Sequence, residues 1–222
     1  DTNTLDYGQA ALHYTSTSGG FDYGFIYYAG YNKLPSFNYE FDGDKTVNYW
    51  YEYDPMQTFG LEAAYVLAGL NLRGEFAYNM TQDFDGHKSD VHNHNIAWVG
   101  GFDRDIPVSN LNINIQEAGR LILNKNEIAM GDIEYNDEEE YTQNLLILKL
   151  SDKYLHEKLE AEVIVFYHFE DADYGVYPKL EYSPVDDFTL GMEARFFGGD
   201  DDSLFGQYDD NDLVEFTVAF DF

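Results

Sequence analysis

The last nine residues, Val214–Phe222, read Val-Glu-Phe-Thr-Val-Ala-Phe-Asp-Phe. Large apolar side chains alternate along this stretch with a second set, which is Glu215, Thr217, Ala219 and Asp221. Successive side chains of a β-strand point to opposite faces, so a slip of one residue would exchange phenyl rings for carboxylates. The stretch therefore predicts a final β-strand with a well-specified register.

The same alternation recurs upstream in about twelve segments of about eight to eleven residues, the length that a tilted strand needs to cross a bilayer. Helical periodicity is scarce. The clearer segments are Phe188–Phe196, Val176–Tyr182, Leu159–Phe169, Leu70–Tyr78 and Phe59–Leu67, and the weaker ones are Leu111–Ile115, Val47–Tyr53 and Phe21–Tyr27. Alternation alone is also typical of soluble sandwiches and lipocalins.

Two further features favour a membrane barrel over a soluble sheet. Several apolar faces end in Tyr or Phe, as interfacial aromatic girdles do, and the connections tend to alternate short with long. Short connections are expected at Ala68-Gly69 and Ser183–Asp187, and long ones at Met80–His92, Arg120–Glu140 and Gly198–Asn211. We therefore predict an all-β, antiparallel transmembrane β-barrel with about twelve strands in this chain, in which residues 1–222 form one barrel domain or a barrel fragment.

The N-terminal third fits this scheme less well. Strict up-and-down order, counted back from a periplasmic C-terminus, places the long Asn32–Lys45 connection on the periplasmic side and the compact Asp54–Thr58 turn outside, the reverse of expectation. Either one strand is miscounted, for example within Arg120–Glu140, or the first third is irregular.

The amino-acid composition limits the classes of partner that the protein can bind. Aromatic residues make up 18% of the chain at a mean hydropathy of -0.46, and the formal net charge is -30. Such a charge argues against nucleic acid as a partner and favours cations. The chain has no cysteine, which excludes disulfides and thiol catalysis. No signal peptide is recognisable at Asp1–Asp6, so an export signal is either cleaved or upstream.

The C-terminal residues Val218–Phe222 resemble the terminal signal that outer-membrane barrel assembly machinery reads. That resemblance implies that Phe216, Val218, Phe220 and Phe222 form an assembly signal. It also implies a Gram-negative outer membrane, with its lipid and lipopolysaccharide as surroundings.

A longer stretch resembles a large family of proteobacterial porin-like outer-membrane proteins. The similarity lies in Tyr177–Tyr182, Asp186–Gly191, Phe197–Asp200, Phe205–Gln207 and Asp210–Asp212, and more faintly in Phe59–Leu61 and Leu72–Glu75. Members of that family are considerably longer, which leaves open both a complete barrel and the C-terminal half of a larger one. The family's substrates are largely unassigned, so the resemblance implies fold and location but no catalytic residues.

If the apolar faces meet lipid, the opposite faces line a lumen. The residues expected there are Glu52, Glu62, Arg73, Glu75, Glu160, Glu162, Lys179, Glu181, Glu193, Arg195, Glu215 and Asp221. Their acidic excess predicts a passive channel for small hydrophilic solutes with a mild preference for cations. The alternatives are a barrel filled by paired charges, acting as a scaffold, adhesin or partner platform through acidic loops, and a soluble ligand-binding β protein. The oligomeric state stays open.

No enzyme and no resident cofactor are expected. His13 and Ser16 would lie on opposite faces of a strand, and no Gly-x-Ser-x-Gly motif occurs. Carboxylates in the run Asp200, Asp201 and Asp202 could coordinate Ca²⁺, but the spacing of a calcium-binding loop is missing and a solvated, repulsive loop face is the alternative. His87, His92 and His94, with Asp85 or Asp90, form a second candidate metal set whose alternative is again solvated loop side chains.

Overall fold

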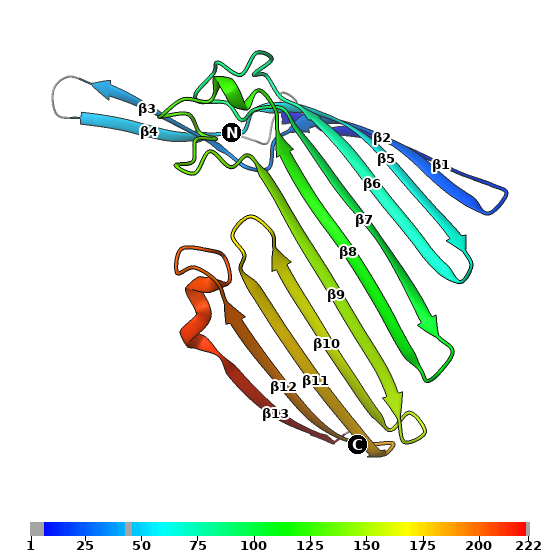
Figure 1. The fold of residues 1–222 in the computed structure, drawn as a ribbon. Helices are drawn as coiled ribbons and strands as arrows, with labels where there is room; N and C mark the ends of the chain where they lie inside the picture. The colour runs from blue at the N-terminus through cyan, green and yellow to red at the C-terminus, as the bar shows by residue number, and fades with distance from the viewer. Residues whose placement is uncertain (1–6, 43–45, 221–222) are drawn as a thin grey trace. The chain divides into compact units, whose positions relative to one another are not determined.

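In the computed structural model, which describes residues 7–42 and 46–220, the chain is built almost entirely of β-strands (Figure 1). The strands are β1 (Ala10–Ser18), β2 (Phe21–Tyr31), β3 (Ser36–Asp42), β4 (Thr46–Glu52), β5 (Pro55–Leu67), β6 (Leu70–Met80), β7 (Asn95–Ile106), β8 (Leu111–Ile122), β9 (Thr142–Tyr154), β10 (Leu159–His168), β11 (Tyr174–Val185), β12 (Phe188–Gly198) and β13 (Leu213–Phe220). Short 3-10 helices, η2 (Lys125–Glu127) and η3 (Gly206–Asn211), lie in connections. The prediction of an all-β, antiparallel protein is confirmed.

The described strands form two sheets. Eleven of them follow the order β1-β2-β5-β6-β7-β8-β9-β10-β11-β12-β13, while β3 and β4 make a separate two-stranded sheet. In this order of described strands β1 and β13 are the edges. Closure of the sheet into a barrel, and its passage through a membrane, stay predictions.

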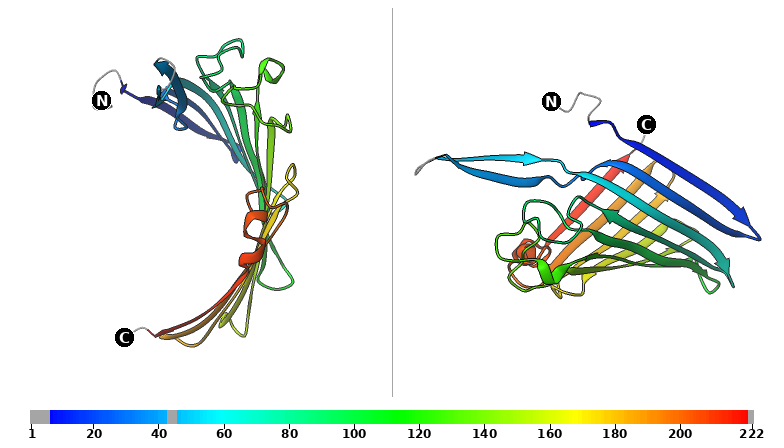
Figure 2. Two further views of the ribbon diagram at one scale, coloured as in Figure 1. Left: turned by 90° about the vertical axis from the view of Figure 1, so that its left-hand side faces the viewer. Right: turned by 90° about the horizontal axis from the view of Figure 1, so that it is seen from above.

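The hairpin of β3 and β4 explains the irregular N-terminal third. The backbone amide of Asn32 donates to the carbonyl of Asp54 at 2.8 Å, and the Ser36 hydroxyl donates to the Asp54 carboxylate, so the base of the hairpin is closed. Figure 2 shows the hairpin extending away from its neighbours β2 and β5. The whole stretch from Asn32 to Asp54 is therefore one long excursion, and the expected turn at Asp54–Thr58 is wrong because β5 begins at Pro55.

Short and long connections alternate along the chain as predicted. Ala68 and Gly69 form the two-residue link between β5 and β6 with φ of 52° and 79°. Two positive φ values suit the tight turns that match strand twist. The link between β11 and β12 is shorter than the predicted Ser183–Asp187, because β11 continues through an irregularity in register between Tyr182 and Val185. This irregularity contains Pro184, whose nitrogen cannot donate to a ladder.

The registers of the C-terminal strands confirm the predicted faces. Val218 pairs with Leu190 on the apolar face, and Leu190 pairs with Tyr182. On the other face Glu215 pairs with Glu193, and Glu193 with Lys179. Asp221 and Phe222, which the alternation assigns to the same strand, lie outside the described residues.

The distribution of buried side chains is the reverse of that in a soluble domain, since polar side chains are buried and apolar ones exposed. Among the described residues the buried hydrophobic side chains are Val91, Tyr141 and Ala194, whereas the largest fully buried side chains are Asn93, Asp83, Asp173 and Ser36. Phe216 and Val218, by contrast, are 76% and 70% exposed. The apolar face of the strands is therefore not covered by the described part of the chain.

The chain divides into two compact units. Unit 1 comprises Asp1–Ala64, Gly74–Trp98 and Arg120–Thr142, and unit 2 comprises Tyr65–Arg73, Val99–Gly119 and Gln143–Phe222. Most of the candidate pore-lining residues belong to unit 2, while the longest ordered loops belong to unit 1.

Candidate pore-lining face

A row of charged residues crosses the polar face of unit 2. Its centre is a cross-strand ladder in which Glu162 of β10 faces Lys179 of β11, Lys179 faces Glu193 of β12, and Glu193 faces Glu215 of β13. A second ladder beside it pairs Lys153 with Glu160, and Glu160 with Glu181. Because directly opposed side chains lie about 5 Å apart, the register alone brings these charges together.

Ion pairs join the two ladders to each other and to two further bases, Lys149 and Arg195. The Nζ atom of Lys149 lies 2.6 Å from Oε2 of Glu162. Lys179 and Glu181 are 2.9 Å apart, as are Arg195 and Glu193. These side chains are partly exposed, so each pair contributes about 0–1 kcal/mol to stability. The pairs orient the charges more than they stabilise the fold.

The polar face continues across the strands that precede β9. Arg73 of β6 donates to Asp103 of β7 at 2.8 Å, and Asn112 of β8 donates to Asp105 at 2.8 Å. A hollow of about 400 Å³ is lined by Asp105, Ser109, Asn110, Asn112, Ser151, Lys153 and Glu157. Polar groups of β7, β8 and β9 therefore share one surface within unit 2.

We define the charged face as the acidic residues Asp103, Asp105, Glu160, Glu162, Glu181, Glu193 and Glu215 together with the basic residues Arg73, Lys149, Lys153, Lys179 and Arg195. Acids outnumber bases on it. No ion pair of Glu215 occurs among the described residues. The charged face thus carries opposite charges on neighbouring strands, and its net charge is negative.

The structure places the predicted pore-lining residues in four groups. Arg73, Glu160, Glu162, Lys179, Glu181, Glu193, Arg195 and Glu215 lie on the charged face of unit 2. Glu62 and Glu75 belong to unit 1, where Glu62 lies 2.8 Å from Nε2 of His13. Glu52 lies in the hairpin strand β4, outside the eleven-stranded sheet. Asp221 is outside the described residues.

Four charged members of the face were not expected from the sequence. Lys149 and Lys153 belong to β9, in which the run Leu145–Leu148 is apolar on both faces and hides the alternation. Asp103 and Asp105 belong to β7, where Gly100-Gly101 interrupts it. The period-two spacing of Lys149, Ser151 and Lys153 is the signal that could have revealed the first pair.

The connection between β12 and β13 packs onto this same side of the sheet. The Phe205 ring stacks on His168 with centroids 5.4 Å apart and also contacts Phe166 and Phe197. Its backbone amide donates to Oδ2 of Asp173 at 2.6 Å, while Oδ1 of Asp173 lies 2.6 Å from Nδ1 of His168. Asp173 is fully buried, so this carboxylate ties the connection to the end of β10.

We expect Asp173→Asn to release the connection between β12 and β13. An amide nitrogen would then face a nitrogen donor of Phe205 or His168, and loss of a hydrogen bond to a buried charged group costs about 1.5–3 kcal/mol. Limited proteolysis between residues 199 and 212 should accelerate. Asp187→Asn, at an exposed position in the link between β11 and β12, is the control. Equal cleavage of both variants would contradict the role of Asp173 in holding the connection.

The described acidic and histidine side chains gather differently from the two predicted metal sets. His168, Asp171 and Asp173 form a group whose ligand atoms lie within 4.8 Å of one another, whereas Asp200, Asp201 and Asp202 are in no such described group. His92 lies 2.8 Å from Glu134, His94 lies 2.6 Å from the Tyr78 hydroxyl, and His87 lies 3.5 Å from Glu127. Each histidine thus has a partner at Nδ1, while the Nε2 atoms of His92 and His94 are buried without a hydrogen-bond partner among the described residues.

Comparison with protein-family models and with curated protein sequences finds no match. Within the described part of the chain, no helix has the length and apolar character needed to span a membrane.

Proposed function

We propose that this protein is a porin-like channel of a Gram-negative outer membrane, through which small hydrophilic solutes diffuse passively with a mild preference for cations. The observation that carries this proposal is the inverted burial: apolar side chains are exposed on one face of the strands, and charges line the other. Soluble monomers rarely expose contiguous apolar patches of more than a few hundred Å². Contact with the hydrocarbon core of a membrane would make the exposure of such an apolar face favourable.

The apolar face of β12 and β13 illustrates the point. Phe216 pairs with Met192, and Phe220 with Phe188, in the register that also brings Val218 beside Leu190. Leu190, Met192 and the apolar residues of β13 are all exposed. Lipid chains would cover such an apolar face. The alternation of long with short connections is also typical of outer-membrane barrels.

The proposal requires the strand edges to be paired. Unsatisfied backbone groups are costly in hydrocarbon, so only closed sheets span a bilayer. Strands β1 and β13 would therefore pair with each other, with another segment of a longer chain, or with a second copy.

The charged face supports the cation preference. Opposite charges at short range orient polar solutes, and an acidic excess lowers the energy of cations relative to anions. Unpaired Glu215 adds to that excess at the edge strand.

The packing of Phe205 favours a second candidate function. A connection that covers part of the polar face would narrow or fill a lumen, which suits a scaffold or partner platform working through its acidic loops. Deletion of residues 199–211 distinguishes the two functions. If the protein is a channel, the deletion should raise its ion conductance. If it is a partner platform, the deletion should abolish partner binding, and neither the intact nor the shortened protein should conduct ions.

Reconstitution into planar bilayers tests the channel directly. We expect stepwise ion conductance and, across a KCl gradient, a reversal potential of the sign that cation preference produces. Protein that inserts but conducts no ions would refute the channel, and anion preference would refute the role given to the charged face. Extraction into buffer without detergent would refute the membrane location itself.

A further inference from the structure

The two longest loops of unit 1 are joined by hydrogen bonds around a buried polar cluster. One loop, residues 81–94, connects β6 to β7, and the other, residues 123–141, connects β8 to β9. The amide of Leu123 donates to the carbonyl of His94 at 2.8 Å, and the amide of Ile133 donates to the carbonyl of Ser89 at 2.9 Å. Both loops are therefore ordered against each other within one unit.

Asp83 is fully buried at the centre of this cluster. Its Oδ1 atom accepts the backbone amides of Gly86, His87 and Lys88 at 3.1, 3.1 and 3.2 Å. Its Oδ2 atom is buried without a hydrogen-bond partner among the described residues. One oxygen of this side chain thus organises the loop, and the other is left unsatisfied.

Asn93 is the neighbour of Asp83 across a β-bridge and is also fully buried. Its Nδ2 atom donates to the carbonyl of Leu123 at 2.9 Å, which determines how the amide is oriented. The positions of Oδ1 and Nδ2 are therefore fixed, and Oδ1 has no hydrogen-bond partner in the part of the chain that the structure describes. Two buried acceptors without donors are costly, because each has lost its water.

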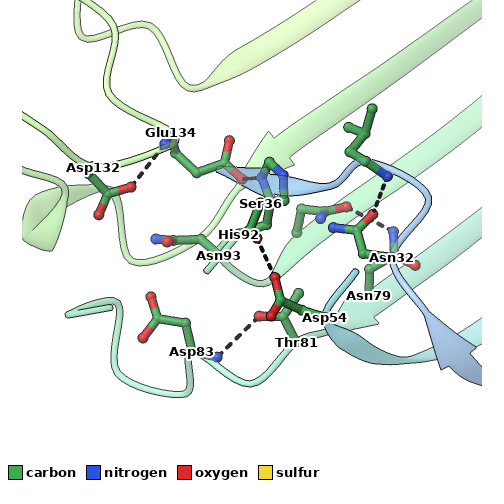
Figure 3. Close-up of polar contacts among 12 residues, drawn as sticks. Asn32, Ser36, Asp54, Asn79, Thr81, Asp83, His92, Asn93, Asp132 and Glu134 are labelled. Atoms are coloured by element: carbon green, nitrogen blue, oxygen red, sulfur yellow. Dashed lines mark hydrogen bonds and ion pairs between the residues drawn. The ribbon is translucent and has the colours of Figure 1, made fainter. Parts of the chain in front are cut away.

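The other loop contributes a carboxyl group, that of Asp132. Figure 3 shows Asn93 between the side chains of Asp83 and Asp132. Oδ1 of Asp132 accepts the amide of Glu134 at 2.9 Å. Burial raises the pKa of Asp132, the hydrogen bond from the Glu134 amide lowers it, and the charges of Glu134 and Asp83 raise it again. Glu134 itself is paired with His92 and Arg120. The carboxyl groups of Asp83 and Asp132 are therefore near enough to influence each other.

We propose that Asp83 Oδ2 and Asn93 Oδ1, with the carboxylate of Asp132, bind a calcium ion that fastens the loop before β7 to the loop before β9. Carboxylate and amide oxygens are the ligands that Ca²⁺ takes, in a flexible geometry that suits loop residues. Zn²⁺ is the competing ion, because the Nε2 atoms of His92 and His94 are buried without a hydrogen-bond partner among the described residues. The oxygen atoms of Asp83, Asn93 and Asp132 favour Ca²⁺, and the titration below compares the two ions directly.

Calcium titration of the full chain, folded in detergent, tests the site. Salt of about 0.15 M and an excess of Mg²⁺ suppress diffuse binding to a chain of net charge -30. We expect one saturable Ca²⁺ site with a dissociation constant on the order of 10⁻⁴–10⁻³ M, the range of extracellular calcium modules, and a higher melting temperature with Ca²⁺. No saturable site, or tighter binding of Zn²⁺ than of Ca²⁺, would overturn the proposal.

Asp83→Asn is the decisive variant. An asparagine can keep the three amide hydrogen bonds through its oxygen, and it removes a buried acceptor that has no donor among the described residues. We expect the Ca²⁺ affinity to fall by at least about 100-fold, since ligand charge sets calcium affinity, while the calcium-free protein melts no lower than the wild type. Asp85→Asn is the matched control, with the same charge change at an exposed position in the same loop. Equal affinities of the two variants would contradict the site.

Asn93→Asp is a second variant that should change the Ca²⁺ affinity in the opposite direction, and it tests the site even if Asp83→Asn does not fold. A second carboxylate should tighten Ca²⁺ binding by about 10-fold and lower the melting temperature without Ca²⁺. An unchanged response to Ca²⁺ would refute the site. These results do not depend on whether the protein conducts ions.

Discussion

Val218→Arg will prevent the chain from folding into lipid bilayers. Val218 lies in the middle of the apolar side of β13, opposite Leu190, and is 70% exposed. An arginine on the lipid face of a membrane barrel costs about 2–4 kcal/mol near the bilayer midplane, which is a large share of a protein's net stability. Folding into vesicles, followed by heat-dependent mobility on gels and by protease resistance, measures the loss.

Thr217→Arg is the control for this prediction. Thr217 is the next residue along β13 but points to the charged face, where it opposes Gly191 and follows Glu215 by two positions. Arginine there has space and an acidic neighbour, so folding into vesicles should persist. If Val218→Arg folds as well as Thr217→Arg, or makes the chain more soluble in water, the lipid-facing role of this side is wrong.

Removing three carboxylates from the charged face will reverse its ion selectivity. In the triple variant Glu162→Gln, Glu193→Gln and Glu215→Gln, the bases outnumber the remaining acids on the charged face. Lys149 and Arg195 lose their ion-pair partners. Because fixed charge sets the relative energies of cations and anions in a pore, the reversal potential across a KCl gradient should change sign.

The matched control changes as many charges elsewhere. Glu138, Glu139 and Glu140 are exposed in the connection before β9, and their replacement by glutamine should leave the sign unchanged. Because exposed ion pairs contribute about 0–1 kcal/mol each, both triple variants should fold. If the reversal potential shifts equally in the two triple variants, the selectivity depends only on the total charge of the protein. The charged face would then not line the conduction path.

Period-two patterning predicted the C-terminal strands and the faces of their side chains, because alternation along a strand is a local property of the chain. The same patterning placed Glu162, Lys179, Glu193 and Glu215 on the polar faces of their strands, and the pairing of the strands brought them into one row. The patterning failed where both faces are apolar, as at Leu145–Leu148 of β9, and where glycines interrupt it, as in β7. Lys149 and Asp103 were missed for those reasons.

The sequence by itself therefore determined a two-faced antiparallel sheet with charge on one side, since a strand's side chains alternate whatever lies beside it. Only the tertiary structure decided that β3 and β4 leave that sheet, since their separation depends on Asn32 and Ser36 meeting Asp54. It also decided that Asp83 and Asn93, neighbours across a β-bridge, each bury an oxygen without a hydrogen-bond partner among the described residues. Such contacts join residues far apart in sequence through loops without periodicity, and so no local pattern encodes them.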